Sequence, residues 1–402
     1  MDFLCKFAVL LKICIDMELN YIPRTIAFEI REALKYFPVL TLTGPRQSGK
    51  STLLKHLFPD VPYYSLENYD TRQFATDDPR GFLNRFEDGV IIDEVQNVPE
   101  LLSYIQGIVD EYPERRFYLT GSSQFALLKN VTQSLAGRTA VFELLPLSLG
   151  EIAEVKRETK VDELLYSGFY PAIWSGRQIP KYLYPNYVKT YVERDVRDLL
   201  MIKDLDKFQR FIRLCAYRIG SIFNASEISN ELGVSVNTVN SWLSVLQASY
   251  LVFLLPPFYT NTRKRLTKSP KIFFTDCGLA SYLMEVDSPS DVARDKMRGH
   301  LFENMIVIEY LKRAYNKGRN GNLYFYRDSN GNEVDLLVKE GQKYMCIEIK
   351  SSSTFHPDFL KGIKTFATEF GDMIGGKRLI YTGENLPAFD GVEIVNYQDD
   401  SL

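Results

Sequence analysis

Cysteine and histidine are scarce in this chain of 402 residues, and their scarcity limits the chemistry that it can carry. The five cysteines are scattered, odd in number and without a Cys-x-x-Cys pair. This pattern argues against a disulfide framework and against a zinc site, and it is typical of a protein in a reducing cytoplasm. With only His56, His300 and His356 present, catalysis centred on a histidine has few candidates.

Long apolar runs and a basic excess are also lacking. The apolar stretch "FAVLLKICI" at residues 7–15 is interrupted by Lys12, whereas a membrane-spanning helix needs about 20 apolar residues. It has neither the basic start nor the cleavage site of a signal peptide, so we expect no membrane association. We interpret residues 1–20 as an N-terminal extension, with Met17 as an alternative start. The net charge of -3 argues against a protein that coats DNA with its whole surface, although a local basic patch remains compatible with it.

Apolar strands alternate with helices in the N-terminal third. Strands are expected at residues 37–44, 62–68, 89–96 and 115–123, with helices such as 24–36, 50–58 and 99–112 between them. This alternation predicts a parallel sheet covered by helices on both faces.

The stretch "GPRQSGKS" at residues 44–51 follows one of these strands and precedes a helix. It has the G-x-x-x-x-G-K-[ST] spacing of a P-loop, in which backbone N–H groups and a helix N-terminus surround phosphate oxygens. We expect Lys50 to reach the β- and γ-phosphates of ATP and Ser51 to bind Mg2+. The residues expected to bind nucleotide here are Gly44, Pro45, Arg46, Gln47, Ser48, Gly49, Lys50, Ser51 and Thr52.

Two acidic residues end the apolar strand "VIIDE". Asp93 is expected to hold Mg2+ through water, and Glu94 to polarise the attacking water, which favours hydrolysis of ATP over transfer of phosphate. The next strand ends in "YLTGSS", where Ser122 either senses the γ-phosphate or only shapes a turn.

An arginine near the γ-phosphate would stabilise the charge of the transition state. Arg138, in "SLAGR", is our preferred candidate, and Arg194 and Arg197 are alternatives that an exposed, charged helix explains equally well. An arginine that acts on the nucleotide of another copy would require a homo-oligomer, whereas one that acts within its own chain would not.

The stretches "LTGPRQSGKSTLLK", "IIDEVQ", "YLTGSSQF", "SLAGR" and "LLPLSLGEI" together resemble a family of prokaryotic AAA-type P-loop ATPases. "YVERDVRDL" and "SPKIFFTDCGLASYL" extend the likeness over nearly the whole chain from about Tyr21. The resemblance implies an ATPase module, a winged helix and an endonuclease-like C-terminal domain of largely unassigned role. Ser51 stands where the family more often has threonine, and it keeps the hydroxyl.

Residues 224–255 are typical of two helices joined by a glycine-centred turn and followed by a strand, as in a winged helix-turn-helix. The second helix, "SVNTVNSWLSVLQ", lacks lysine and arginine, so internal packing competes with DNA reading as its role. The basic run "TRKRLTKSPK" at residues 262–271 is the best nucleic-acid candidate, with a solvated loop as the alternative.

Carboxylates and a lysine gather in the C-terminal third. Asp335 lies on the expected strand "EVDLLVKE", and Glu348 and Lys350 point to one face of the next strand. Cleavage of a phosphodiester with Mg2+ needs carboxylates and a cation near the attacking water. With Glu303 on the preceding helix, the order resembles the PD-(D/E)XK nuclease fold, although Val334 replaces its usual proline. The resemblance implies Glu303, Asp335 and Glu348 as metal ligands and Lys350 as the residue that orients the water.

The predicted fold class is therefore α/β, a P-loop NTPase with a three-layer parallel sheet followed by a winged helix and a restriction-endonuclease-like domain. Expected boundaries are 21–155 for the ATPase domain, 156–205 for a helical connector, 206–265 for the winged helix and 266–402 for the nuclease-like domain. The leading hypothesis is hydrolysis of ATP with Mg2+, coupled to a domain that binds or cleaves nucleic acid, with DNA as the candidate partner. The alternatives are an ATP-dependent scaffold with an inactive nuclease-like domain that binds a protein, and a P-loop phosphotransferase.

Overall fold

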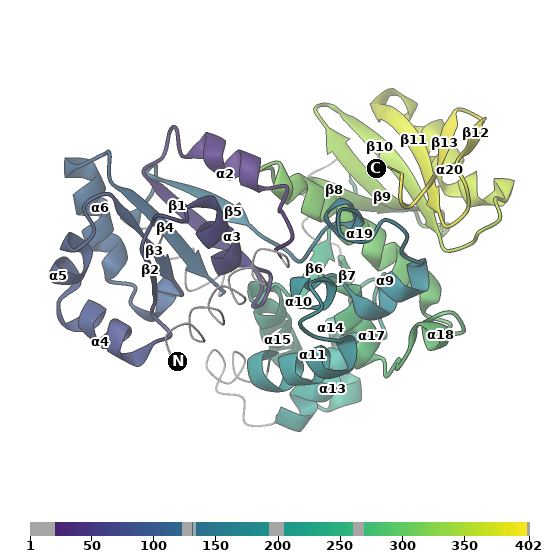
Figure 1. Ribbon diagram of the computed structural model, residues 1–402. Coiled ribbons are helices and arrows are strands. Elements are labelled where there is room, and N and C mark those ends of the chain that lie inside the picture. The colour runs from purple at the N-terminus through teal and green to yellow at the C-terminus, as the bar shows by residue number, and fades with distance from the viewer. Residues whose placement is uncertain (1–20, 123–130, 132–133, 193–204, 260–268, 400–402) are drawn as a thin grey trace, which may run out of the picture.

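The computed structural model describes residues 21–122, 131, 134–192, 205–259 and 269–399. Within these ranges a parallel sheet with its helices comes first, a mainly helical region follows, and a mixed sheet comes last (Figure 1). The predicted extension over residues 1–20, Arg194 and Arg197 lie outside the described residues. No helix in the described ranges has both the length and the apolar composition that crossing a bilayer requires.

The first sheet has five strands in the order β2-β3-β4-β1-β5, all parallel. Its strands are β1 (Val39–Thr43), β2 (Tyr63–Ser65), β3 (Gly89–Asp93), β4 (Arg116–Gly121) and β5 (Thr139–Glu143). The helices are α2 (Ala27–Ala33), α3 (Lys50–Leu57), α4 (Tyr69–Asp77), α5 (Pro79–Asn84) and α6 (Leu101–Glu111), with a 3-10 turn at Val95–Asn97.

Alternate side chains of β3 explain why both faces of this sheet are covered. Val90 and Ile92 join the core formed with α5 and α6, and Ile91 joins the core formed with α2 and α3. Successive residues of a strand point to opposite faces, so a run of apolar residues needs a helix layer on each side. The predicted three-layer arrangement is confirmed.

The middle region is helical apart from an antiparallel pair of strands. It contains α8 (Leu149–Ala153), α9 (Val161–Ser167), α10 (Pro171–Trp174), α11 (Pro180–Tyr187) with a π-helical turn at Val188–Val192, α13 (Leu205–Ala216), α14 (Ala225–Leu232), α15 (Val236–Ala248), β6 (Val252–Leu255), β7 (Lys271–Phe274), α17 (Cys277–Leu283) and α18 (Pro289–Val292). Gly233, at a φ of 61°, ends α14 before α15 begins, so the expected glycine-centred turn is present.

The last region is a mixed six-stranded sheet in the order β12-β13-β11-β10-β9-β8. Its elements are α19 (Arg298–Asn316), β8 (Leu323–Arg327), β9 (Glu333–Glu340), β10 (Lys343–Lys350), a 3-10 turn at Pro357–Leu360, α20 (Lys361–Phe370), a 3-10 turn at Gly371–Met373, β11 (Ile374–Tyr381), β12 (Leu386–Phe389) and β13 (Val392–Asn396). The strands predicted around Asp335 and Glu348 are β9 and β10, which form an antiparallel pair.

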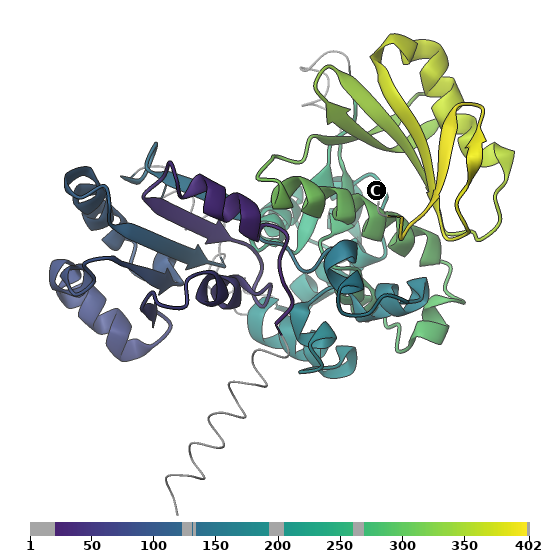
Figure 2. The same cartoon turned by 45° about the horizontal axis from the view of Figure 1, so that its top comes forward.

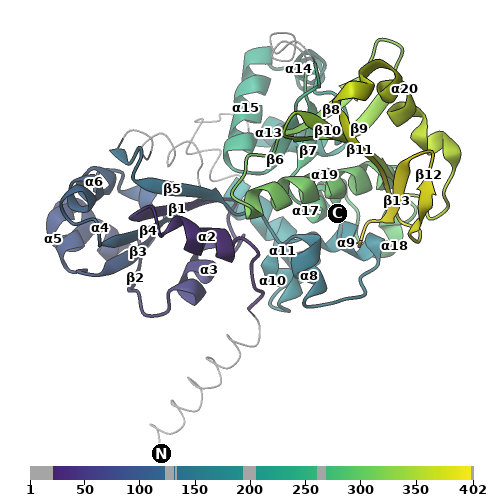
Figure 3. The same ribbon diagram turned by 90° about the horizontal axis from the view of Figure 1, so that it is seen from above.

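Helices α19 and α20 cover the two faces of this sheet (Figure 2). α19 packs against β10, against α17 and against β7 (Figure 3). As a result, one large apolar core joins the middle region to the last sheet. The middle region and the C-terminal sheet are therefore packed as a continuous body around α19.

Candidate ATP site and C-terminal carboxylate centre

The P-loop lies at the carboxyl end of β1 and leads directly into α3. Gly44 has a φ of 145°, and a Cβ atom there would lie 2.1 Å from the carbonyl oxygen of Leu144. Gly49, at a φ of 95°, precedes the first residue of α3. Both positions therefore require glycine, because a side chain would be strained or would collide with β-sheet backbone. Lys50 is buried, and its Nζ donates to the carbonyls of Gly44 and Pro45 at 2.9 Å each.

Ser51 and Asp93 meet at the edge of the sheet. The Ser51 hydroxyl donates to Asp93 Oδ1 at 2.8 Å, and the Thr120 hydroxyl donates to the same oxygen. Asp93 Oδ2 accepts from the Tyr63 hydroxyl at 2.7 Å. A hydroxyl and a carboxylate are hard oxygen ligands of the kind that Mg2+ prefers, so this pair fits the ion. Bound there, Mg2+ would supply positive charge beside the phosphates.

Glu94 is held in a fixed orientation next to Ser51 and Asp93. Its backbone is in the left-handed region, at a φ of 54°, and its carboxylate is buried. Glu94 Oε2 accepts from the backbone N–H and the hydroxyl of Ser122, at 3.2 and 3.0 Å, and also from the side-chain amide of Gln96. The structure thus brings Asp93, Glu94 and Ser122 together, with Ser122 in contact with the expected base.

Arg138 lies at the opposite end of the sheet from the P-loop. It immediately precedes β5, and its carbonyl accepts from Val39 N–H, at the first residue of β1. Its guanidinium forms two hydrogen bonds with the carboxylate of Asp110, at 2.6 and 2.8 Å. A strand of this length separates it from the phosphate site by roughly 15 Å. The prediction of Arg138 as the catalytic arginine left open whether it acts within its own chain or on another copy. Its position argues against action within its own chain, because parallel strands place it at their amino ends, away from the P-loop.

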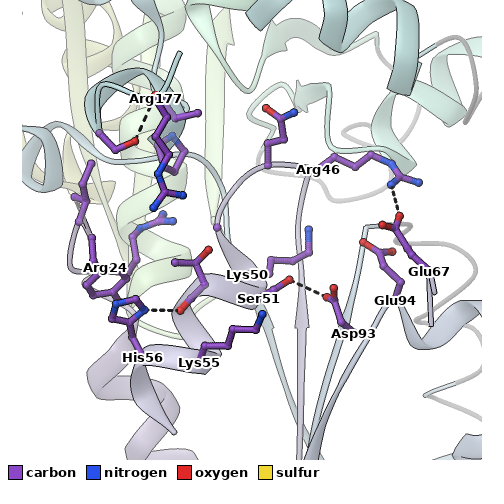
Figure 4. Close-up of a pocket in the computed structure, with 18 residues that line it drawn as sticks. Arg24, Arg46, Lys50, Ser51, Lys55, His56, Glu67, Asp93, Glu94 and Arg177 are labelled. Carbon is purple, nitrogen blue, oxygen red and sulfur yellow. Dashed lines mark hydrogen bonds and ion pairs between the residues drawn. The ribbon is translucent and has the colours of Figure 1, made fainter. Parts of the chain in front are cut away.

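A cavity of about 610 Å³ adjoins the P-loop and receives residues from three parts of the chain. Arg24 and Arg177 lie on one side, with Asp93 and Glu94 on the other (Figure 4). Tyr21 stacks on the ring of His56, with ring centroids 3.7 Å apart. The other lining residues are Ile22, Arg46, Gln47, Gly49, Lys50, Ser51, Thr52, Lys55, Glu67, Pro171, Ala172 and Ser175. The middle region thus contributes to the wall of this pocket.

Arg24 connects the segment before α2 to the P-loop. Its guanidinium donates to the carbonyls of Ser48 and Leu145, at 2.8 and 2.7 Å, and it forms a buried ion pair with Glu151. Neither Arg24 nor Tyr63 was singled out from the sequence, because each acts on a residue distant along the chain. The tyrosine in the strand before "VIIDE" gives no local signal of its contact with Asp93.

The Tyr63→Phe variant tests the role of the tyrosine hydroxyl. Loss of the 2.7 Å hydrogen bond frees Asp93 Oδ2, and partners of metal ligands typically contribute about tenfold in metal affinity or more. We expect the Mg2+ concentration for half-maximal ATP turnover to rise about tenfold. The control is Tyr64→Phe, since the Tyr64 ring packs against Phe82 and Phe86. Equal Mg2+ dependence of the two variants would contradict this role.

The second cluster of charges lies between β9, β10 and α19. Lys350 Nζ is 3.0 Å from Asp335 Oδ2 and 2.9 Å from Glu348 Oε2. Asp335 Oδ2 also accepts from the backbone N–H of Ile349 at 2.8 Å. Carboxylate oxygens of Glu303, Glu333 and Asp335 lie within 4.8 Å of one another. The structure therefore brings the four predicted residues together and adds Glu333, two residues before Asp335.

Burial and neighbouring charges shift the acidities in this C-terminal carboxylate centre. Burial raises the pKa of Glu303 to about 7, although the charge of Lys271 opposes the shift. Burial and the nearby Asp335 carboxylate raise the pKa of Glu348 well above its usual value. Burial acts against ionisation of Asp335 too, but the charges of Lys350 and Lys271 leave its pKa below the usual value. Such perturbed groups are common at functional sites and in structural ion-pair networks.

Lys271 ends the basic run that was expected to face nucleic acid. Instead it is buried, at 2% exposure, and its Nζ forms ion pairs with Glu303 and Glu333. The expectation is wrong for this residue, because β7 packs against α19 and directs the side chain inward. Residues 262–268 of the run lie outside the described residues.

Comparison with known domain families divides the chain into three parts. Residues 36–153 match an AAA domain family. Residues 158–290 and 298–399 match two families described as domains of unknown function, DUF8612 and DUF4143.

Two uncharacterized proteins align with most of this chain. An uncharacterized protein of Mycobacterium tuberculosis, Rv2008c, is 28% identical over 379 residues, covering 92% of this chain and 83% of its own. The uncharacterized protein MJ1544 of Methanocaldococcus jannaschii is 23% identical, over 84% of this chain and 78% of its own. Among solved structures, a Walker-type ATPase of Pyrococcus abyssi aligns with a TM-score of 0.43 and 16% identity, over 66% of this chain and 99% of its own. Together with the geometry of the P-loop, the AAA domain match supports a P-loop AAA-type ATPase in the N-terminal part of this chain.

Proposed function

We propose that this protein hydrolyses ATP to ADP and phosphate with Mg2+. The observation that carries the proposal is the assembly of Ser51, Asp93 and Glu94 beside Lys50 at one edge of the parallel sheet. In this proposal Lys50 binds the β- and γ-phosphates, Ser51 and Asp93 hold Mg2+, and Glu94 takes a proton from the attacking water. Ser122 orients Glu94 through two hydrogen bonds.

The direct test is the product of the reaction. Purified protein incubated with ATP and Mg2+ is expected to release free phosphate and ADP in equal amounts. Accumulation of a phosphorylated acceptor in place of free phosphate would favour the phosphotransferase alternative. Absence of any ATP turnover, with Mg2+ and ATP both in excess, would contradict the proposal.

We further propose that the nucleotide state is transmitted to the rest of the chain. The Tyr250 hydroxyl, from the turn between α15 and β6, hydrogen-bonds to Thr43, the last residue of β1 before the P-loop, at 2.7 Å. Glu309 and Lys312 on α19 bond to the backbone of Leu149 and Leu147, at 2.9 and 2.7 Å. The first contact connects the base of the ATP site to the middle region, and the other two connect the segment after β5 to α19.

Arg177 is the proposed contact of the middle region with the nucleotide phosphates. It is an exposed cation that lines the pocket from the segment after α10. Loss of one charge-assisted contact of about 1.5 kcal/mol corresponds to about tenfold in affinity, so Arg177→Ala is expected to raise the Kd for ATP about tenfold. The control is Arg157→Ala, another exposed arginine of the middle region that lines a different cavity. Calorimetric titration with ATP measures both, and equal affinities would exclude this role.

A second candidate function concerns the C-terminal domain, which we propose is nuclease-like and binds nucleic acid or a protein. It is favoured by the convergence of Glu303, Asp335, Glu348 and Lys350 on one centre. Stimulation of ATP turnover by DNA would favour nucleic acid as the partner. Turnover that is indifferent to DNA would favour the scaffold alternative.

A further inference from the structure

The C-terminal carboxylate centre contains a lysine that comes from the middle region. Lys271 is the first residue of β7, and its Nζ lies 2.9 Å from Glu303 Oε1 and in contact with the carboxylate of Glu333. Its backbone is fixed by pairing with Leu255 of β6, and the next residue accepts a hydrogen bond from Gly220 N–H at 2.9 Å. Because the backbone of Lys271 is fixed in this way, its ammonium group is held at the centre.

We propose that Lys271 takes the place of a divalent cation in this centre, so that the domain keeps nuclease-like residues but neither binds metal there nor cleaves phosphodiesters. The inference rests on the nuclease-like interpretation of the domain and is independent of ATP hydrolysis. It predicts that the domain acts by binding a partner.

The ion pairs of the centre carry the first part of the argument. Lys271 bridges Glu303 and Glu333, and Lys350 bridges Asp335 and Glu348. Each of the four carboxylates therefore has a lysine partner. A metal ion bound by Glu303 and Glu333 would displace the ammonium of Lys271. The side chain of Lys271 is 3% exposed, so the ammonium would be left as a buried charge without its partners. Breaking a buried pair in this way is strongly unfavourable.

Close backbone contacts around the carboxylates are the second observation behind the proposal. A Cβ atom on Gly220, whose φ is 71°, would lie 3.0 Å from Glu303 Oε2. A Cβ atom on Gly362, in α20, would lie 1.8 Å from the carbonyl oxygen of Glu333 and 2.3 Å from Glu348 Oε1. Main chain thus presses on Glu303 from the middle region and on Glu348 from α20. The backbone of Gly220 and Gly362 therefore occupies one side of each of these two carboxylates.

Binding of Mn2+ to the nucleotide-free full-length protein tests the proposal, with the free ion measured by electron paramagnetic resonance. The wild type and Asp335→Asn are expected to bind Mn2+ equally, because any ion held near the P-loop is common to both. Lys271→Met removes the charge and keeps much of the side-chain volume. It is expected to gain a Mn2+ ion that the double variant Lys271→Met/Asp335→Asn does not bind. Lys343→Met, at an exposed position of β10, is the matched control and is expected to behave as the wild type.

Two results would overturn the proposal. The first is a Mn2+ ion in the wild type that Asp335→Asn removes, and the second is a folded Lys271→Met variant that gains no ion. If circular dichroism shows that Lys271→Met does not fold, cleavage of plasmid DNA is measured with the wild type and with Lys271→Arg, which keeps the charge. Cleavage by the wild type that Lys350→Ala abolishes contradicts the proposal. Intact DNA with both the wild type and Lys271→Arg supports it. Because nucleotide is omitted, a failure of ATP hydrolysis leaves these outcomes unaffected.

Discussion

Replacement of Glu94 by glutamine is expected to lower the rate of ATP hydrolysis by about 10²–10⁴-fold, the range of a general base. Glutamine keeps the shape of the side chain and can still accept from Ser122, but it cannot take a proton from water. Binding of ATP is expected to be unchanged within about threefold, since the phosphates bind to Lys50 and the P-loop backbone in this account. Phosphate release measures the first quantity and calorimetric titration the second.

The control for this variant lies beyond the other end of the same strand. Glu87 is an exposed glutamate before the amino end of β3, whereas Glu94 follows its carboxyl end. Glu87→Gln removes the same charge at the far end of the strand and is expected to leave turnover unchanged. Equal rates for Glu94→Gln and the wild type would show that another group activates the water.

Replacement of Gly362 by alanine is expected to destabilise the C-terminal domain by about 3 kcal/mol, at the upper end of the cost of overpacking. The added methyl group would lie 1.8 Å from the carbonyl oxygen of Glu333, so α20 has to move away from β9. The shift would also disturb Glu348, whose Oε1 lies 2.3 Å from the same position. Urea denaturation of the wild type and variant measures the free energy of unfolding.

Gly371 supplies a matched control at the other end of the same helix. It has helical backbone angles, and a Cβ atom there would have open space around it. Gly371→Ala is therefore expected to leave stability unchanged or raise it by up to about 1 kcal/mol. Equal stabilities of the two alanine variants would mean that α20 does not press on the carboxylate centre.

The ATP site could be predicted from the sequence because its parts are local. Gly44, Lys50 and Ser51 lie within one loop between a strand and a helix, and Asp93 and Glu94 end a strand whose apolar run is plain. Parallel strands bring their carboxyl ends to one edge, so the two groups had to meet. The C-terminal strands around Asp335 and Glu348 could also be predicted, because their sequence patterns are local too.

The parts that were missed depend on contacts between distant segments. Strand β5 was not predicted, so nothing indicated that Arg138 stands before a strand and at the wrong end of the sheet. Lys271 belongs to a basic run by sequence, and only the packing of β7 on α19 turns its side chain into the core. Tyr250 contacts Thr43, which lies 207 residues earlier in the chain. Such long-range contacts produce no periodic or compositional pattern in the sequence.

The most direct test of the central claim measures ATP turnover and DNA cleavage in one reaction. Wild-type protein would be incubated with ATP, plasmid DNA and either Mg2+ or Mn2+, beside Lys50→Ala and Lys350→Ala. We expect release of phosphate that Lys50→Ala abolishes and Lys350→Ala leaves intact, while the plasmid stays uncut in every reaction. Cleavage of the plasmid by the wild type, lost in Lys350→Ala, would contradict the account and identify the protein as a nuclease.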